Sequence, residues 1–163
     1  MNTTFHYPVK LGNRDGGPAS WLASSGKGPA DGSYSGRAGG TPHERLLGKR
    51  VLIVEDEALL ALELQLAFED EGAEVLGPAL SLMKALETVT HEREIDVAVL
   101  DVDLAGEDVY PIAELLLQRG VPFIFHTAHG SRNVLSGLFP GALTCTKPTL
   151  PDTLIGHLMR LAR

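Results

Sequence analysis

The sequence predicts an α/β fold built on a doubly wound parallel sheet, and three observations lead there. From residue 50 onward, short apolar runs rich in β-branched residues alternate with amphipathic helical patterns. Strands that alternate with helices favour right-handed βαβ crossovers, which give a parallel sheet covered on both faces. The length of 163 residues suits one domain of ordinary size plus an extra segment.

The chain divides into two parts near residue 48. Residues 1–48 contain the stretch "GKGPADGSYSGRAGGTP", which is dense in Gly, Ser and Pro and has no helical or strand periodicity. Such a segment buries too little apolar area to offset its ordering entropy, so we expect a disordered tail. Trp21 and Leu22 could form a short docking element, although a solvated linker is the simpler interpretation. Residues 49–163 then form the folded domain.

The first strand and helix of this domain have clear patterns. Residues 50–54, "RVLIV", are typical of a buried strand. Residues 57–72 carry a broad apolar stripe that predicts an amphipathic helix ended by Gly72. We expect the large side chains of this stripe to pack into the core first and to bind a partner only second: Leu59, Leu60, Leu62, Leu64, Leu66 and Phe68.

Four further strands and four further helices follow in alternation. The expected strands are residues 73–77, 96–101, 121–127 and 142–146. Ser81, Asp108 and Thr149 are predicted to cap the second, third and fifth helices, and a weak fourth helix is expected near residues 131–138. Five strands and five helices in about 115 residues predict a flavodoxin-like (βα)5 sheet with strand order 2-1-3-4-5.

Composition limits the kinds of partner. The net charge of the chain is −7, and the part from Lys49 onward holds nine basic and eighteen acidic residues. Such a domain would repel nucleic acid and suits a metal cation or a basic protein patch. The single cysteine, Cys145, excludes an internal disulfide and is expected to act as a small buried hydrophobe. With no signal peptide and no apolar run long enough for a membrane span, we expect a cytoplasmic protein.

Carboxylates gather where the predicted strand order reverses. Glu55 and Asp56 follow the first strand directly, and Asp101 ends the third strand in "VAVLDVDL". The carboxyl ends of neighbouring parallel strands lie at one edge of a sheet, so these side chains are expected to converge. Three carboxylates are costly together unless a cation binds or one of them is protonated. Oxygen-only ligands favour Mg²⁺.

A hydroxyl and an ammonium are predicted at the same edge. Thr127 ends the fourth strand and Lys147 follows the fifth. Carboxylate, Mg²⁺, hydroxyl and ammonium together can hold a phosphoryl group, because the cations neutralise its oxygens and the hydroxyl donates a hydrogen bond. Asp101, at the centre of the sheet, is the natural nucleophile.

The motifs "VLIVEDE", "VAVLDVDL", "FHTA" and "TKP", in this order, resemble the receiver domain of two-component response regulators over roughly residues 49–163. The resemblance implies that Asp101 accepts a phosphoryl group from a histidine kinase or phosphotransfer protein. It also implies that Asp56 and Asp101 bind Mg²⁺ through side chains, Asp103 through its backbone carbonyl and Glu55 through water. Thr127 would then contact the phosphoryl group, Lys147 would pair with it, and the Lys147–Pro148 bond would be cis.

Two further features qualify this resemblance. "LAGED" and "RGVPFIFHTAHG" are similar to a subgroup of stand-alone receivers, so we expect a single-domain regulator that signals by protein contacts or phosphorelay. Thr144 stands where receivers commonly have an aromatic residue that rotates with the threonine hydroxyl. We therefore look for the conformational switch in residues 128–142, whose composition predicts a poorly formed helix.

Other interpretations compete with a phosphorylated signalling protein that is not an enzyme. One is a receiver-like docking module that works without phosphorylation; a downstream protein partner and a homodimer fit either version. Another is an aspartate-nucleophile phosphatase of the haloacid dehalogenase type, which would need a substrate-holding cap and an acidic pair after the nucleophile. His126 and His129 could be metal ligands, but their spacing fits packing and surface roles better.

Overall fold

The structure is a computed structural model that describes residues 44–128 and 132–162. The predicted tail up to residue 43 and His129 lie outside this range. A five-stranded parallel sheet has the order β2-β1-β3-β6-β7, which confirms the predicted order of the five main strands. These strands are β1 (Arg50–Val54), β2 (Glu74–Ala79), β3 (Val97–Asp101), β6 (Phe123–Thr127) and β7 (Leu143–Thr146).

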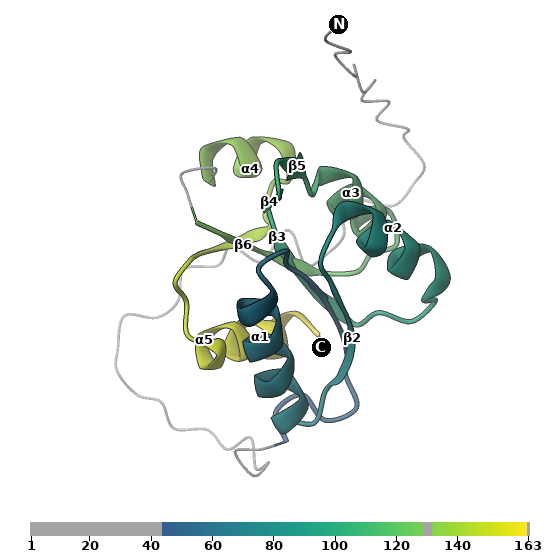
Figure 1. Ribbon diagram of the computed structural model, residues 1–163, viewed down its shortest axis with the longest axis vertical. Coiled ribbons are helices and arrows are strands. Elements are labelled where there is room, and N and C mark those ends of the chain that lie inside the picture. Colours follow the sequence, from purple (N-terminus) through teal and green to yellow (C-terminus); the bar gives the residue numbers. More distant parts are fainter. Residues whose placement is uncertain (1–43, 129–131, 163) are drawn as a thin grey trace, which may run out of the picture.

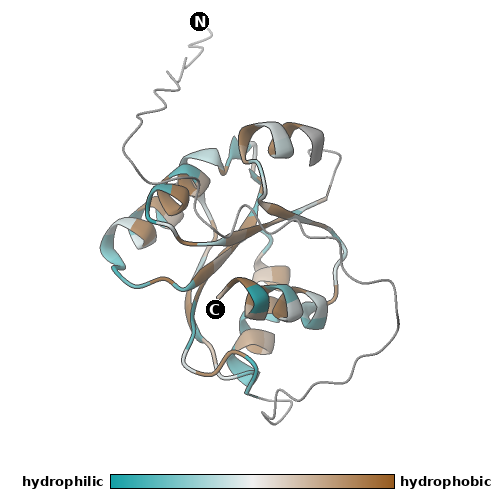
Figure 2. Ribbon diagram, turned by 180° about the vertical axis from the view of Figure 1, so that it is seen from behind, coloured by the Kyte–Doolittle hydropathy of each residue, from teal (hydrophilic) through white to brown (hydrophobic). Residues whose placement is uncertain are grey.

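Helices cover both faces of the sheet (Figure 1). One face carries α1 (Ala58–Asp70) and α5 (Pro151–Leu161), and the other carries α2 (Leu82–His91), α3 (Tyr110–Gln118) and α4 (Arg132–Leu138). Each face has its own apolar core. The strands are the most hydrophobic part of the ribbon in Figure 2, as expected for strands buried on both faces. Among the described residues, no helix is long and apolar enough to cross a membrane.

Helix α1 differs from the expectation that its whole leucine stripe enters the core. Leu64 and Phe68 are fully buried, as predicted. Leu59, Leu62 and Leu66 are 79%, 49% and 58% exposed, so a core position was wrong for these three. A helix that packs on a sheet buries only the side that faces the sheet. Residues three and four positions apart on the opposite side of the helix also line up, and they form a second stripe. Here that second stripe faces solvent.

Of the three predicted helix caps, one is confirmed and two are wrong. The Ser81 hydroxyl accepts a hydrogen bond from a backbone N–H in the first turn of α2, at 3.3 Å. Helix α3 begins after Val109 instead of Asp108, and α5 begins after Leu150 instead of Thr149. A proline in the first turn sets both starts, because its fixed φ suits that position and it has no N–H to cap.

A two-stranded hairpin that the sequence analysis did not predict follows β3. Its strands are β4 (Asp103–Leu104) and β5 (Glu107–Asp108), which pair antiparallel. The turn between them places Ala105 at φ 55° and Gly106 at φ 92°, in the left-handed region that suits glycine. Asp108 therefore pairs with Asp103 in this hairpin and does not cap α3.

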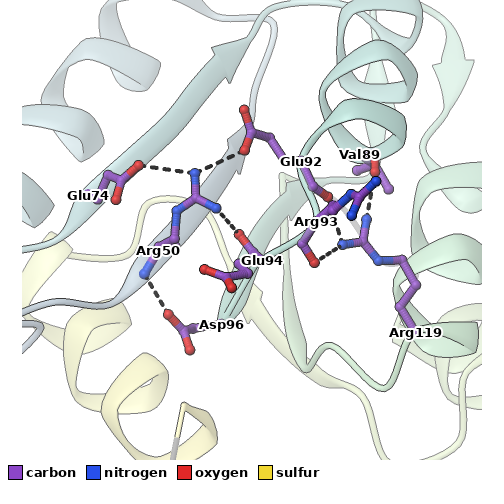
Figure 3. Close-up of polar contacts among 8 residues, drawn as sticks. All are labelled: Arg50, Glu74, Val89, Glu92, Arg93, Glu94, Asp96 and Arg119. Atoms are coloured by element: carbon purple, nitrogen blue, oxygen red, sulfur yellow. Dashed lines mark hydrogen bonds and ion pairs between the residues drawn. The ribbon is translucent and has the colours of Figure 1, made fainter.

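At the amino-terminal edge of the sheet, Arg50 joins the starts of three strands (Figure 3). Its backbone N–H donates to the Asp96 carboxylate at 2.7 Å, just before β3. Its guanidinium contacts the carboxylates of Glu74, at 3.1 Å, and Glu92, at 2.9 Å, and donates to the carbonyl of Glu94 at 2.7 Å. The guanidinium and the backbone N–H of Arg50 therefore both have partners.

Arg119, after α3, closes the end of α2 on the same edge (Figure 3). Its guanidinium donates to the carbonyls of Val89, Glu92 and Arg93 at 2.6, 2.7 and 2.7 Å. The last carbonyls of a helix lack intrahelical partners and carry its negative dipole end, so a cation there satisfies both needs.

Residues 44–48, which the sequence analysis assigned to the tail, form a turn against the end of α1. Leu46 is fully buried in the α1–α5 core, and its N–H donates to the carbonyl of Glu71 at 2.8 Å. Arg45 pairs with the carboxylates of Glu71 and Asp152, which ties this turn to both helices. The domain boundary at residue 48 stays a prediction.

Candidate functional site

The residues predicted for the site meet at the carboxyl edge of the sheet. A cavity of about 290 Å³ there is lined by side chains that follow β1, β3, β6 and β7, with β4 beside them. Five predicted residues line it: Asp56, Asp101, Asp103, Thr127 and Lys147. The sixth, Glu55, is buried beneath them, with 1% of its surface exposed.

Three carboxylates form a group that could hold a metal ion. Glu55, Asp56 and Asp101 each offer one oxygen, and these oxygens all lie within 4.8 Å of one another. Asp101 is 7% exposed, at the end of the central strand β3. Hard oxygen ligands in a small, partly open cavity suit Mg²⁺, which keeps some of its waters.

Lys147 is the cation within this group. Its Nζ donates to Asp101 Oδ2 at 2.6 Å and lies 2.7 Å from Glu55 Oε2. The Lys147–Pro148 bond is cis, as the resemblance implied. When all three carboxyl groups are ionised, one ammonium leaves two negative charges without a counter-charge in the cluster. That excess matches the charge of one divalent cation.

Burial and charge shift the protonation of this cluster. Desolvation, together with the charge of Asp101, raises the pKa of Glu55 to about 7, although the contact with Lys147 opposes the increase. Burial alone would lower the pKa of Lys147, but its bonds to the two carboxylates outweigh burial and raise it. Lys147 is therefore charged at neutral pH, whereas Glu55 loses its proton near neutrality in the absence of a metal.

Asp103 has a different position from the other three carboxylates. Its side chain is exposed and accepts a hydrogen bond from the Gly106 N–H at 2.6 Å, within the hairpin turn. Its own N–H lies 3.4 Å from Asp101 Oδ1. Asp56 Oδ2 accepts from the Ala105 N–H at 3.0 Å, so the hairpin contacts the acidic group through its backbone.

Thr127 and Lys147 are connected through the backbone. The Lys147 N–H donates to the Thr127 carbonyl at 2.8 Å, beyond the last paired residues of β6 and β7. Thr127 itself is buried and lines the cavity. Thr144 is half-buried in β7 and pairs with Phe125 of β6.

His126 is a feature of this edge that the sequence analysis did not recognise. It was predicted to pack, and it is buried, with 1% exposed. Neither ring nitrogen has a hydrogen-bond partner among the residues that the structure describes. The sequence could have pointed to His126, because it is the one ionisable residue in the strand "VPFIFHT", in which all other residues are apolar except Thr127. His126 is not part of the acidic group found in the described chain, so the structure gives no support for a metal-ligand role.

The comparison with known families decides the classification. The family model of the response regulator receiver domain matches residues 51–158. The chain belongs to this family. Its fold and sequence are thus those of a receiver domain, the module of two-component signalling.

Individual relatives of this receiver domain agree. It is similar to the response regulator PhyR from Brucella abortus, with 30% identity, a TM-score of 0.63, and 73% of this chain and 49% of that chain covered. The receiver domain of Francisella response regulator 1452 matches at 25% identity and a TM-score of 0.61, over 71% of this chain and 97% of that one.

A curated relative is the phosphate regulon transcriptional regulatory protein PhoB of Pseudomonas aeruginosa, 34% identical over 124 residues, which are 72% of this chain and 53% of that protein. The chain spans about half the length of the curated relatives it matches. The activities of those whole proteins therefore do not transfer directly to this receiver domain.

Proposed function

We propose that this receiver domain accepts a phosphoryl group on Asp101 from a histidine kinase or phosphotransfer protein, in a Mg²⁺-dependent reaction, and signals through protein contacts. The observation that supports this most strongly is the convergence of three carboxylates around Asp101 and Lys147 at the end of the central strand. This arrangement has a nucleophile, a cation and an excess negative charge in one small cavity.

The proposed reaction transfers one phosphoryl group. A carboxylate oxygen of Asp101 forms the new O–P bond, while the P–N bond of a phosphohistidine breaks and its electron pair stays on the donor imidazole. The Lys147 ammonium donates to Asp101 Oδ2 at 2.6 Å, which holds this carboxylate in place for attack on the phosphorus. The product is an acyl phosphate on the side chain of Asp101.

The other residues handle the charge of the arriving group. Asp56 and Asp101 would hold Mg²⁺ by their side chains, Asp103 by its carbonyl and Glu55 through water. The bound ion supplies charge neutralisation for the phosphoryl oxygens. Thr127 would donate its hydroxyl to the phosphoryl group, and Lys147 would pair with an oxygen of it. These cations must offset roughly two negative charges, because that is what a phosphoryl group brings.

The exposed side of α1 is the surface we propose for protein contacts. Leu59, Leu62 and Leu66 form an exposed stripe at helical spacing, beside the acidic Glu63 and Glu69. Exposed apolar stripes of this kind mark interaction sites. The α4 segment within residues 128–142 is proposed as the part that responds to phosphorylation. The stand-alone arrangement and a homodimer stay predictions.

The decisive experiment is chemical labelling of the purified protein. Acetyl phosphate with Mg²⁺ should add 80 Da by mass spectrometry, in an acid-stable but base- and hydroxylamine-labile form typical of an acyl phosphate. Asp101→Asn is the variant expected to lose the label, and Asp103→Asn is the matched control that keeps the acceptor. Failure of the wild type to label, with acetyl phosphate and with a panel of histidine kinases, would refute the proposal.

A phosphorylation-independent docking module is the second candidate. Thr144 favours it, because the aromatic side chain that receivers commonly move on activation is replaced by a small polar one. The two candidates differ in one measurement: partner affinity of the wild type with and without beryllofluoride. A change in affinity supports the phosphorylated switch, whereas equal affinities support the docking module.

A further inference from the structure

His126 lies one residue before Thr127 and between the two reactive strands. In the sheet register it pairs with Asp101 on β3 and with Cys145 on β7. Side chains alternate along a strand, so His126 faces the same side as Ile124, which packs in the α1–α5 core. The imidazole therefore lies on the side of the sheet that α1 and α5 cover.

The position of this imidazole is energetically unfavourable as it stands. Both ring nitrogens are buried without a hydrogen-bond partner among the described residues. Leaving a buried polar group unpaired costs about 1–3 kcal/mol, and an apolar residue of similar size would avoid that cost. Such unsatisfied groups call for an explanation, and a functional one is common near reactive sites.

The neighbour that gives His126 a role is Lys147. Both residues line one cavity of about 800 Å³ between the start of α1 and the start of α5, together with Glu57, Leu60 and Pro148. Burial first, and the charge of Lys147 second, lower the pKa of His126 to about 4, while Asp101 opposes this decrease. Neither ring nitrogen has a hydrogen-bond partner among the described residues, so a ring nitrogen without a proton would offer a free lone pair on the side of this cavity.

In this structure the Lys147 ammonium faces carboxylates. Its Nζ lies 2.8 and 2.7 Å from the two oxygens of Glu55 and 2.6 Å from Asp101 Oδ2, so three oxygens surround its three N–H donors. When Asp101 becomes an acyl phosphate, its charge moves outward onto the phosphoryl oxygens. Lys147 must then reorient, and an acceptor on the α1–α5 side can hold its remaining N–H while another N–H points to the phosphoryl group.

We propose that His126 is a positioning residue for Lys147, whose ammonium donates to an imidazole nitrogen of His126 when Asp101 carries the phosphoryl group. This inference rests on the proposed function, because it concerns the phosphorylated form of the same site. In the unphosphorylated protein the imidazole has no partner among the described residues, and in the phosphorylated protein it would accept a hydrogen bond from Lys147. Phosphorylation would therefore add one hydrogen bond.

The test compares two substitutions of His126 with a control on the same strand face. His126→Leu removes both nitrogens but fills the space, and His126→Gln keeps an acceptor. Ile124→Val changes packing on that face without removing a polar group. For each protein, the rate of acetyl phosphate labelling, the half-life of the acyl phosphate and Tm are measured. Loss of a charge-assisted hydrogen bond should change the labelling rate or the half-life roughly tenfold or more.

The expected pattern separates positioning from packing. His126→Leu should raise Tm and yet slow labelling or shorten the half-life roughly tenfold. His126→Gln should recover most of that loss, and Ile124→Val should lower Tm without changing the rate. If His126→Leu labels and decays like the wild type, the inference fails although the proposed function stands. If the wild type does not label at all, the proposed function fails first.

A second measurement uses the wild type alone and so does not depend on the folding of a variant. The ¹⁵N shifts of the His126 ring are recorded with Mg²⁺, before and after beryllofluoride is added. We expect one ring nitrogen to move toward the value of a hydrogen-bond acceptor on addition of beryllofluoride, with no change for His157 on α5. Unchanged His126 shifts in a protein that binds beryllofluoride would overturn the inference.

Discussion

The two edges of the sheet use charge in opposite ways. At the amino edge, Arg50 and Arg119 meet carboxylates and helix-end carbonyls in matched bonds of 2.6 to 3.1 Å. At the carboxyl edge, three carboxylates share one ammonium and a buried imidazole has no partner among the described residues. The arginines of one edge have matched partners, whereas the other edge holds more carboxylates than cations and an unpaired imidazole among the described residues.

This difference shows how one sheet can combine stability with reactivity. Matched polar groups stabilise the fold and gain nothing from a ligand, whereas unmatched groups lower stability but create differential affinity for a charged ligand. We therefore expect substitutions at the amino edge to change stability alone. Substitutions at the carboxyl edge should change the response to Mg²⁺ and phosphorylation, with stability moving in either direction.

Removal of the cation from the carboxyl edge should have the largest effect. In Lys147→Ala two carboxylates lose their partner, so the metal-free protein should lose about 3 kcal/mol of unfolding free energy. Mg²⁺ binding should persist, while the affinity change caused by beryllofluoride should disappear. Urea unfolding with and without Mg²⁺, and partner binding, check this. The exposed Lys84→Ala is the control, and full partner response in Lys147→Ala would contradict the comparison.

The second largest effect is expected from His126, as a decrease in the free energy of unfolding at low pH. His126 has a folded pKa of about 4 against 6.5 in the unfolded chain. Between these values the unfolded chain binds a proton that the folded protein does not, so stability falls as pH decreases from 6.5 to 4. The loss amounts to roughly 3 kcal/mol over that window.

The matched measurement is unfolding of His126→Leu at the same pH values. Because other groups also titrate in this range, Glu55 with the opposite sign, the difference between the two proteins isolates the imidazole. That difference should grow steadily as pH decreases below 6.5. A difference that does not depend on pH would show that His126 is not buried in its neutral form.

At the amino edge, Arg119→Ala should lower stability by about 1.5 kcal/mol, because the carbonyls of Val89 in α2 and of the next residues Glu92 and Arg93 lose their donor at a partly solvated site. The labelling rate of Asp101 should not change. Arg93→Ala removes a neighbouring arginine and serves as control, with an expected change below about 0.5 kcal/mol. A labelling defect in Arg119→Ala would show that the two edges are coupled.

The smallest effect is expected from Asp56→Asn, and its sign is the informative part. Asp56 is not among the carboxylates that Lys147 contacts, and an amide oxygen can still accept from the Ala105 N–H. Removing one negative charge from the cluster should therefore raise metal-free stability by about 1 kcal/mol. Mg²⁺ should no longer increase Tm. A lower Tm of metal-free Asp56→Asn than of the metal-free wild type would contradict the idea that repulsion between carboxylates destabilises this edge.

Much of the fold was predictable because burial leaves a strong pattern. The apolar strands and the five-residue run of β3 fixed the sheet order, and the strand ends then brought Asp101, Thr127 and Lys147 together. Their chemical roles, together with Mg²⁺ binding, stay predictions that the experiments above address.

The features that the sequence did not predict depend on short-range backbone geometry, or on which of several neighbours forms a hydrogen bond with a given side chain. The hairpin has strands of two residues, too short for periodicity, and its turn uses Ala105 in a conformation that favours glycine. Thr149 was a reasonable cap, but its hydroxyl donates to a carbonyl 2.6 Å away in β7. Strand β2 runs past Pro78 to Ala79, which an edge strand tolerates.

The bond between Asp56 and the Ala105 amide connects the acidic group to the hairpin before α3. An ion bound by that carboxylate would take electron density from it and weaken the bond, so its arrival would be transmitted to the main chain at one identifiable peptide group. The amide resonance of Ala105 is therefore a natural reporter: titrated with magnesium, it would give the occupancy of the cluster directly from the unmodified protein, with no label attached.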